Sequence, residues 1–192
     1  MTDPAAPDPG DAASADAVLR FWFEEIAPAQ WWKVDPDFDE ALRVRFGALH
    51  RAACQGECWP WRAAGPRGRL AEVIVLDQFS RNLHRGTAGA FAADGMALAL
   101  AQEAVAAGHD QALPPPQRVF VYMPYMHSES RRVHGEAVRL FTALGIADHL
   151  DYEHRHRAIV DRFGRYPHRN AALGRASTAE ELACLQQPGS RF

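Results

Sequence analysis

Side chains that could do chemistry gather in three segments, and the first of these is residues 76–85. Its polar residues are Asp77, Gln78, Arg81, Asn82 and Arg85. Successive residues of an α-helix turn by about 100°, so Asp77, Arg81 and Arg85 fall on one side. Val73 and Ile74 precede them on that same side, and a helix that is apolar all round is normally buried. The stripe is therefore predicted either to face a pocket or to form an Asp–Arg pair on a solvated surface.

The second segment is residues 123–129, which read Met-Pro-Tyr-Met-His-Ser-Glu. Pro124 is predicted to break a helix, and Ser128 to cap the next one. His127 and Glu129 then lie at a helix N-terminus, where free N–H groups favour anions. A histidine beside a carboxylate suits an acid–base pair or metal ligation. The structural alternative is an ordinary helix cap with polar neighbours.

The third segment is the irregular stretch 163–175, which contains two glycines and a proline. Its polar residues are Arg165, His168, Arg169, Asn170 and Arg175. A loop rich in Arg, His and Asn is typical of carboxylate or phosphate recognition. His154, on the helix expected just before the loop, is a candidate for the same area. Alternatively, these side chains satisfy the free carbonyls of helix ends.

The rest of the sequence predicts the scaffold that must position these segments. Hydrophobic spacing and cap signals indicate helices over residues 16–26, 36–55, 69–85, 91–107, 117–122, 129–144, 148–163 and 177–185. The last helix is expected to open on a capping box from Ser177 to Glu180. No sustained alternation of apolar and polar residues indicates a sheet. We expect an all-α fold of about eight antiparallel helices, as a bundle or an α-solenoid.

Composition limits the classes of function. The chain has 192 residues, which fits one domain, and a formal net charge of -3, which offers no basic field for nucleic acid or anionic membranes. Residues 1–13 are acidic and proline-rich and are predicted to be a disordered tail rather than a signal peptide. Residues 14–192 are predicted to form a single helical domain. With no apolar run long enough to span a membrane, a cytoplasmic protein is expected.

Five strings of the sequence resemble the bacterial family called domain of unknown function 924. They are VLRFWFEE, LDQFSRNLHRG, FVYMPYMHSES, FGRYPHRNAALGR and STAEEL, in this order. The resemblance implies a tetratricopeptide-like helical array but no reaction. The polar positions of the family fall on Asp77, Gln78, Arg81, Asn82, Arg85, His127, Ser128, Glu129, His154, Arg165, His168, Arg169, Asn170 and Arg175.

Three functions are compatible with these observations. In the first, the arginines of a helical binding protein hold an anionic small molecule or peptide. In the second, a hydrolase or transferase uses His127 or His168 as the acid–base group, with Glu129 or Asp77 orienting it, on a phosphorylated or carboxylated substrate. In the third, the motifs only pack the fold. The sequence identifies no cofactor, metal set or oligomeric state.

Two geometric expectations separate these functions. Asp77, Arg81, His127 and Arg169 should line one cavity if the motifs form a shared site. An anion-binding cleft is expected to hold more arginines than carboxylates. The sets compared are Arg81, Arg85, Arg165 and Arg169 against Asp77 and Glu129.

Overall fold

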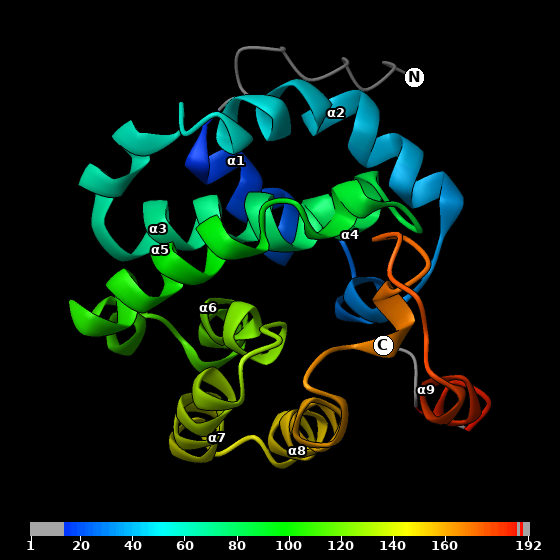
Figure 1. The fold of residues 1–192 in the computed structure, drawn as a ribbon. Coiled ribbons are helices and arrows are strands. Elements are labelled where there is room, and N and C mark those ends of the chain that lie inside the picture. The colour runs from blue at the N-terminus through cyan, green and yellow to red at the C-terminus, as the bar shows by residue number, and fades with distance from the viewer. Residues whose placement is uncertain (1–13, 188, 190–192) are drawn as a thin grey trace.

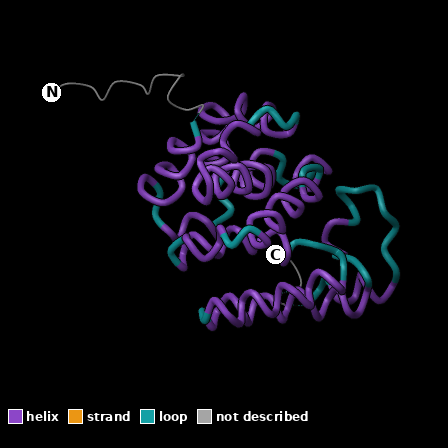
Figure 2. Tube along the Cα trace, turned by 90° about the vertical axis from the view of Figure 1, so that its left-hand side faces the viewer, coloured by secondary structure: helices purple, strands orange, loops and turns teal. Residues whose placement is uncertain are grey.

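The computed structural model describes residues 14–187 and 189, and these form helices and loops without a strand (Figure 2). The α-helices are α1 (Ala15–Arg20), α2 (Pro36–Cys54), α3 (Gly65–Ile74), α4 (Ser80–Leu83), α5 (Asp94–Ala106), α6 (Pro115–Met126), α7 (Arg131–Leu144), α8 (Ala147–Phe163) and α9 (Ala179–Cys184). A π-helical turn (Val75–Phe79) joins α3 to α4 in one continuous helix. Among the described residues this makes about eight helices, which confirms the expected all-α fold. The tail predicted over residues 1–13 lies outside the described residues, and the single domain over 14–192 stays a prediction.

The core of the fold runs through the middle helices. α3 packs against α1, α5 and α6, and the chain continues with α6 against α7 and α7 against α8 (Figure 1). Val18, Phe46, Ile74 and Phe141, from four different helices, are fully buried in one hydrophobic cluster. Within the described part of the chain, no helix is both long and apolar enough to span a membrane.

The helix over residues 65–83 starts earlier than predicted and changes its pitch in the middle. The loop predicted over residues 56–68 contains a 3₁₀ helix (Trp59–Ala64) and the first turn of α3. The π turn adds residues to one helical turn, so the side chains after it are displaced around the axis from their α-helical positions. Because the helix ends at Leu83, Arg85 lies beyond it, and the predicted stripe Asp77–Arg81–Arg85 is divided.

The prediction that Pro124 breaks a helix is wrong, because α6 runs through it to Met126. A proline there removes one backbone hydrogen bond, but every residue from Val119 to Met126 is buried, and that packing keeps the turn in place. Ser128 is likewise not the cap of α7. The N-cap residue is Ser130, whose backbone N–H donates to the Ser128 hydroxyl. His127 is therefore the C-cap residue of α6, at a carbonyl-rich helix end rather than at an anion-favouring N-terminus.

The last helix opens on a capping box one residue later than predicted. Thr178 accepts a hydrogen bond from the Glu181 N–H, and the Glu181 carboxylate accepts one from the Thr178 N–H. The predicted residues Ser177 and Glu180 have side chains that suit a capping box, but each lies one residue before the residue that forms it. Glu181 is thereby buried and available to the loop before it.

Candidate functional site

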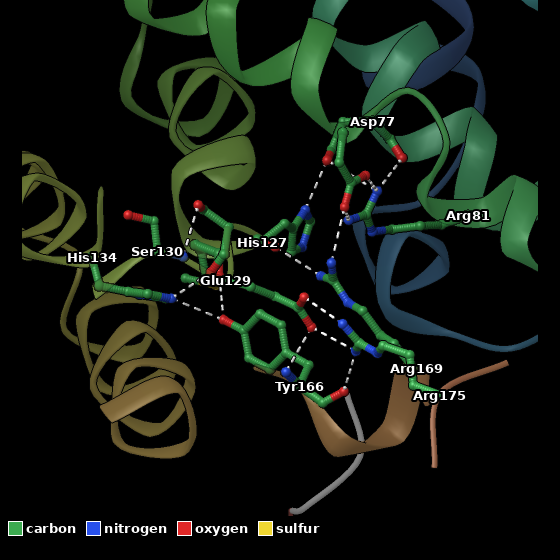
Figure 3. A network of polar contacts seen from close by, with 12 residues as sticks. Asp77, Arg81, His127, Glu129, Ser130, His134, Tyr166, Arg169 and Arg175 are labelled. Atoms are coloured by element: carbon green, nitrogen blue, oxygen red, sulfur yellow. Dashed lines mark hydrogen bonds and ion pairs between the residues drawn. The ribbon is translucent and has the colours of Figure 1, made fainter. Parts of the chain in front are cut away.

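Asp77 and His127 form the centre of a polar cluster between the π turn and the end of α6, although 50 residues separate them in the sequence. His127 Nδ1 lies 2.8 Å from Asp77 Oδ1, and Arg81 Nη1 lies 3.1 Å from the same oxygen. Gln78 donates to the other carboxylate oxygen. Figure 3 shows the His127 ring pointing at Asp77, with Arg81 and Arg169 beside it. We call Asp77, Arg81, His127, Arg169 and Asp94 the inner cluster.

The charges of this pair follow from burial and neighbours. Asp77 is 1 % exposed, and burial opposes its ionisation, but Arg81 and His127 hold the pKa of its carboxyl well below its usual range. Burial, assisted by the Arg81 charge, lowers the pKa of His127. The ring is therefore neutral near pH 7 and donates Nδ1–H to Asp77. With its proton on Nδ1, the neutral ring carries a lone pair on Nε2. Among the described residues, the hydrogen bond to Asp77 is the one that this ring makes.

Two guanidinium groups in the inner cluster share the carboxylate of Asp94, the first residue of α5. Arg81 binds it with two contacts of 3.0 and 3.1 Å, and Arg169 adds one of 3.1 Å. The Arg169 guanidinium lies over the rings of Phe91 and Tyr166, 4.7 and 4.6 Å from their centroids. Arg169 is 6 % exposed, and its Nε is buried without a hydrogen-bond partner among the described residues. One donor of this guanidinium is thus unpaired within the described part of the chain.

The backbone that carries His127 is held by side chains from elsewhere in the fold. A helix leaves its last carbonyls without partners inside the helix. Here, Tyr166 Oη lies 2.6 Å from the Met126 oxygen, Arg169 Nη2 2.8 Å from the His127 oxygen, and His134 Nε2 2.8 Å from the Ser128 oxygen. Three successive carbonyls are satisfied in this way, so the end of α6 is rigid and the position of His127 is defined.

One of these supports ends in a buried carboxyl group. His134 Nδ1 lies 2.8 Å from Glu153 Oε1, and both side chains are fully buried. Burial raises the pKa of Glu153, although the His134 hydrogen bond opposes that shift. Because His134 Nε2 must carry a proton to donate to the Ser128 carbonyl, one further proton lies between Nδ1 and Oε1. The pair is electrically neutral with that proton on either atom.

Imidazole rings surround the buried Tyr166. The rings of His134, His156 and His168 have centroids 6.2, 5.8 and 5.4 Å from that of Tyr166, and His127 lies 6.4 Å from His156. Burial lowers the pKa of His156 to about 3 and that of His168 to about 4. Both rings are therefore neutral at pH 7. Within the described residues, no group of three or more His, Cys, Asp or Glu side chains has the arrangement of a metal site.

Glu129, the other carboxylate considered as a partner of His127, lies between α6 and α7 and binds the loop after α8 instead. Arg175 binds Glu129 through contacts of 2.7 and 2.8 Å, and the Tyr166 N–H donates to it. Burial opposes ionisation of Glu129, but these Arg175 hydrogen bonds lower the pKa of its carboxyl. Asn170 accepts a hydrogen bond from Arg175, so the pair ties the loop to the end of α6.

Ten of the fourteen predicted site residues lie outside the inner cluster. Arg165 is paired with Glu181 of the capping box, and His154 is on the exposed side of α8. Asn82 and Arg85 both donate to Asp39 of α2. We call Asp39, Asn82 and Arg85 the outer cluster.

The expected surplus of arginines is not present in the inner cluster. Arg85 and Arg165 lie elsewhere, and Asp94 adds a carboxylate, so Arg81 and Arg169 face Asp77 and Asp94 in equal number. Neither of two depressions on the described surface is lined by the four residues expected to share a cavity. One, about 420 Å³, is lined by the outer cluster, and the other, about 280 Å³, by His168, Ser177 and apolar neighbours. The four motif residues converge by direct contact instead.

Three residues that form or support the inner cluster are not among the residues predicted from the sequence. Asp94 stands among alanines and glycine, and nothing in that setting marks it. His134 and Glu153 did carry a signal, since each is a polar residue on the buried side of an amphipathic helix. His134 lies three residues before the buried Ala137, and Glu153 three before the buried His156. A buried polar side chain needs a hydrogen-bond partner, and here α7 and α8 supply one to each other through His134 and Glu153.

Comparison with known proteins places the chain in a family. The model of a family described as bacterial protein of unknown function (DUF924) matches residues 18–189. A solved structure, described as a protein of unknown function, ATU0120, from Agrobacterium tumefaciens, is 40% identical with a TM-score of 0.85. The match covers 91% of this chain and 98% of that one. No curated protein matches significantly. The chain belongs to the DUF924 family of bacterial proteins.

Proposed function

We propose that this protein binds an anionic small molecule or the carboxylate of a peptide at the inner cluster. The observation that carries the proposal is the meeting of the Asp77–His127 pair with two guanidinium groups, one of which keeps a buried Nε–H without a partner. A buried donor left unpaired costs free energy, and a ligand oxygen that accepts from it recovers that cost. A tetratricopeptide-like superhelix and a cytoplasmic location, with no role in binding nucleic acid or membranes, belong to the same proposal.

The surroundings favour an anion despite the balanced charges. The donors that hold the Asp94 carboxylate come from Arg81 and Arg169, and the Arg169 guanidinium lies over two aromatic rings. A guanidinium whose orientation is already determined loses little side-chain entropy when it binds a carboxylate or phosphate. The ligand therefore meets donors whose orientation is already determined.

A second candidate is a hydrolase or transferase, and the state of His127 favours it. Asp77 holds Nδ1–H, so Nε2 of the neutral ring can take a proton from a water or hydroxyl nucleophile. The imidazolium so formed is stabilised by the ionised Asp77. The neighbouring arginines then stabilise negative charge that develops on a phosphorylated or carboxylated substrate.

A thermal-shift screen tests the binding proposal. Purified protein is scanned against carboxylates and phosphates, with and without divalent metals, and the hits are measured by calorimetry. Arg169→Gln and Arg81→Gln should each lower the affinity for the ligand at least tenfold, which corresponds to about 1.4 kcal/mol of binding free energy. The matched control is Arg165→Gln, since Arg165 is paired with Glu181 away from the cluster. If Arg81→Gln and Arg169→Gln bind the ligand as tightly as the control variant does, the inner cluster is not the binding site.

The enzyme candidate has its own measurement. His127→Gln should keep most of the ligand affinity but reduce any turnover of that ligand at least a hundredfold, because the base is lost. If turnover survives the substitution, or if no bound ligand is converted, His127 is not a catalytic base.

A further inference from the structure

The guanidinium groups of Arg81 and Arg169 hold the Asp94 carboxylate as they would hold the carboxylate of a ligand. We call these two groups the clamp. The Asp94 carboxylate receives three charge-assisted contacts of 3.0 to 3.1 Å, two from Arg81 and one from Arg169. The Asp94 side chain is nevertheless 20 % exposed, so one side of this arrangement reaches solvent. A two-pronged contact to a planar carboxylate is the geometry that a guanidinium recognises best.

We propose that the ligand of this protein is a monocarboxylate, which binds the clamp by exchange with Asp94. The inference rests on the proposed function and narrows its ligand to one chemical class. In the free protein Asp94 takes the place of the ligand carboxylate, and in the complex it turns out to solvent.

The clamp keeps its shape when Asp94 leaves it. Arg81 Nη1 also contacts the Asp77 backbone oxygen at 2.9 Å and its carboxylate at 3.1 Å. Arg169 stays bonded to the His127 carbonyl and stacked on Phe91. Neither guanidinium depends on Asp94 for its position, so an incoming carboxylate meets the same donors.

Charge selects a monoanion over a dianion. With Asp94 displaced, Arg81 and Arg169 face the single negative charge of Asp77, and the neighbouring Glu129 is neutralised by its own arginine. The clamp then carries one net positive charge. A monocarboxylate balances it, whereas a phosphate dianion leaves an uncompensated negative charge in a mostly buried place.

Asp94 also explains why an external ligand must compete. A tethered group has an effective concentration in the millimolar range or above, so a weak external carboxylate displaces it poorly. Asp94→Asn removes the competing charge but keeps the size of the side chain. Acetate should therefore bind this variant at least tenfold more tightly than it binds the wild type.

The experiment titrates acetate and inorganic phosphate into three proteins at pH 8, where most inorganic phosphate is the dianion, and follows the Nε–Hε signals of Arg81 and Arg169 by NMR. The proteins are the wild type, Asp94→Asn and the control Asp39→Asn, in which another arginine-bound carboxylate is neutralised. We expect the tenfold gain for acetate in Asp94→Asn alone, and a gain below threefold for phosphate. An equal gain for phosphate, or no gain for acetate, overturns the proposal.

A measurement on the wild type covers the case in which Asp94→Asn does not fold. Saturating acetate should move the ¹³Cγ NMR signal of Asp94 toward that of a solvent-exposed carboxylate, because Asp94 leaves its two arginines, and an unchanged signal contradicts the proposal. Failure here is distinct from failure of the proposed function. If anions found in the thermal-shift screen shift the Arg169 and His127 signals while acetate shows no exchange with Asp94, only this inference falls. If no anion shifts those signals in any of the proteins, both fall.

Discussion

The inner and outer clusters both draw residues from the stretch 77–85, yet they have different environments. Each contains an aspartate paired with an arginine, and the side-chain amide of Gln78 or Asn82 donates to that aspartate. The Asp77 side chain is 1 % exposed and that of Arg81 20 %, whereas in the outer cluster Asp39 is 12 % and Arg85 38 % exposed, beside a surface depression of about 420 Å³. Residue types alone therefore do not distinguish the two clusters, and the difference between them lies in how deeply their side chains are buried.

Burial makes every partner in the inner cluster necessary. Asp77 receives hydrogen bonds from His127 and Gln78 and an ion pair from Arg81, so its charge is compensated without water. Water can replace a lost partner at the outer cluster, where ion pairs contribute little. The same substitution should therefore have unequal effects in the two places.

Replacing the aspartates should give the largest difference. Asp77→Ala leaves a buried arginine and a histidine without their common partner, and we expect the free energy of unfolding to fall by about 3–5 kcal/mol. Asp39→Ala, beside the more exposed Arg85, should cost about 1–2 kcal/mol. Urea denaturation of both variants measures the difference. Similar losses at the two sites would contradict the role assigned to burial.

The pH dependence of stability should come next in size. The pKa of His168 is lowered to about 4 and that of His156 to about 3, against about 6.5 in an unfolded chain. Between pH 6.5 and about 4 the unfolded chain therefore binds protons that the folded rings do not. The free energy of unfolding should fall with falling pH, by up to about 1.4 kcal/mol per pH unit for each ring.

Denaturation at several pH values checks this slope. His168→Gln should reduce it by about one proton, because that ring no longer titrates in the unfolded chain. Above pH 7.5 both rings are neutral in both states, so the variant and the wild type should there depend on pH alike. An unchanged acid slope in the variant would show that His168 titrates alike in the folded and unfolded chain.

The smallest effect is expected at Arg85. Arg85→Gln removes a half-exposed ion pair with Asp39, and the loss in stability should be within about 1 kcal/mol. Acetate binding followed at Arg81 and Arg169 should not change. A tenfold change in the affinity for acetate would show that the outer cluster takes part in binding, and the two clusters would then not differ in function.

Local signals in the sequence were enough to predict most helices. Asp35 accepts hydrogen bonds from the N–H groups at the start of α2, as the Asp-Pro pair indicated, and Gly145 ends α7 in the left-handed region with φ +77°. Caps and apolar stripes act over three to five neighbouring residues, so they can be read without the fold. Pro124 was misread because its helix is kept by long-range packing.

For the site, the sequence by itself determined the polar residue types and the three segments that carry them, including Asp77, His127 and Arg169. Only the tertiary structure decided the pairing: Asp77 with His127, Glu129 with Arg175, and Asp94 between two arginines. The physical reason is that each pair joins distant segments through a helix end or a π turn. A change of one residue in pitch or register at such points selects a different partner, and nothing local in the sequence records that choice.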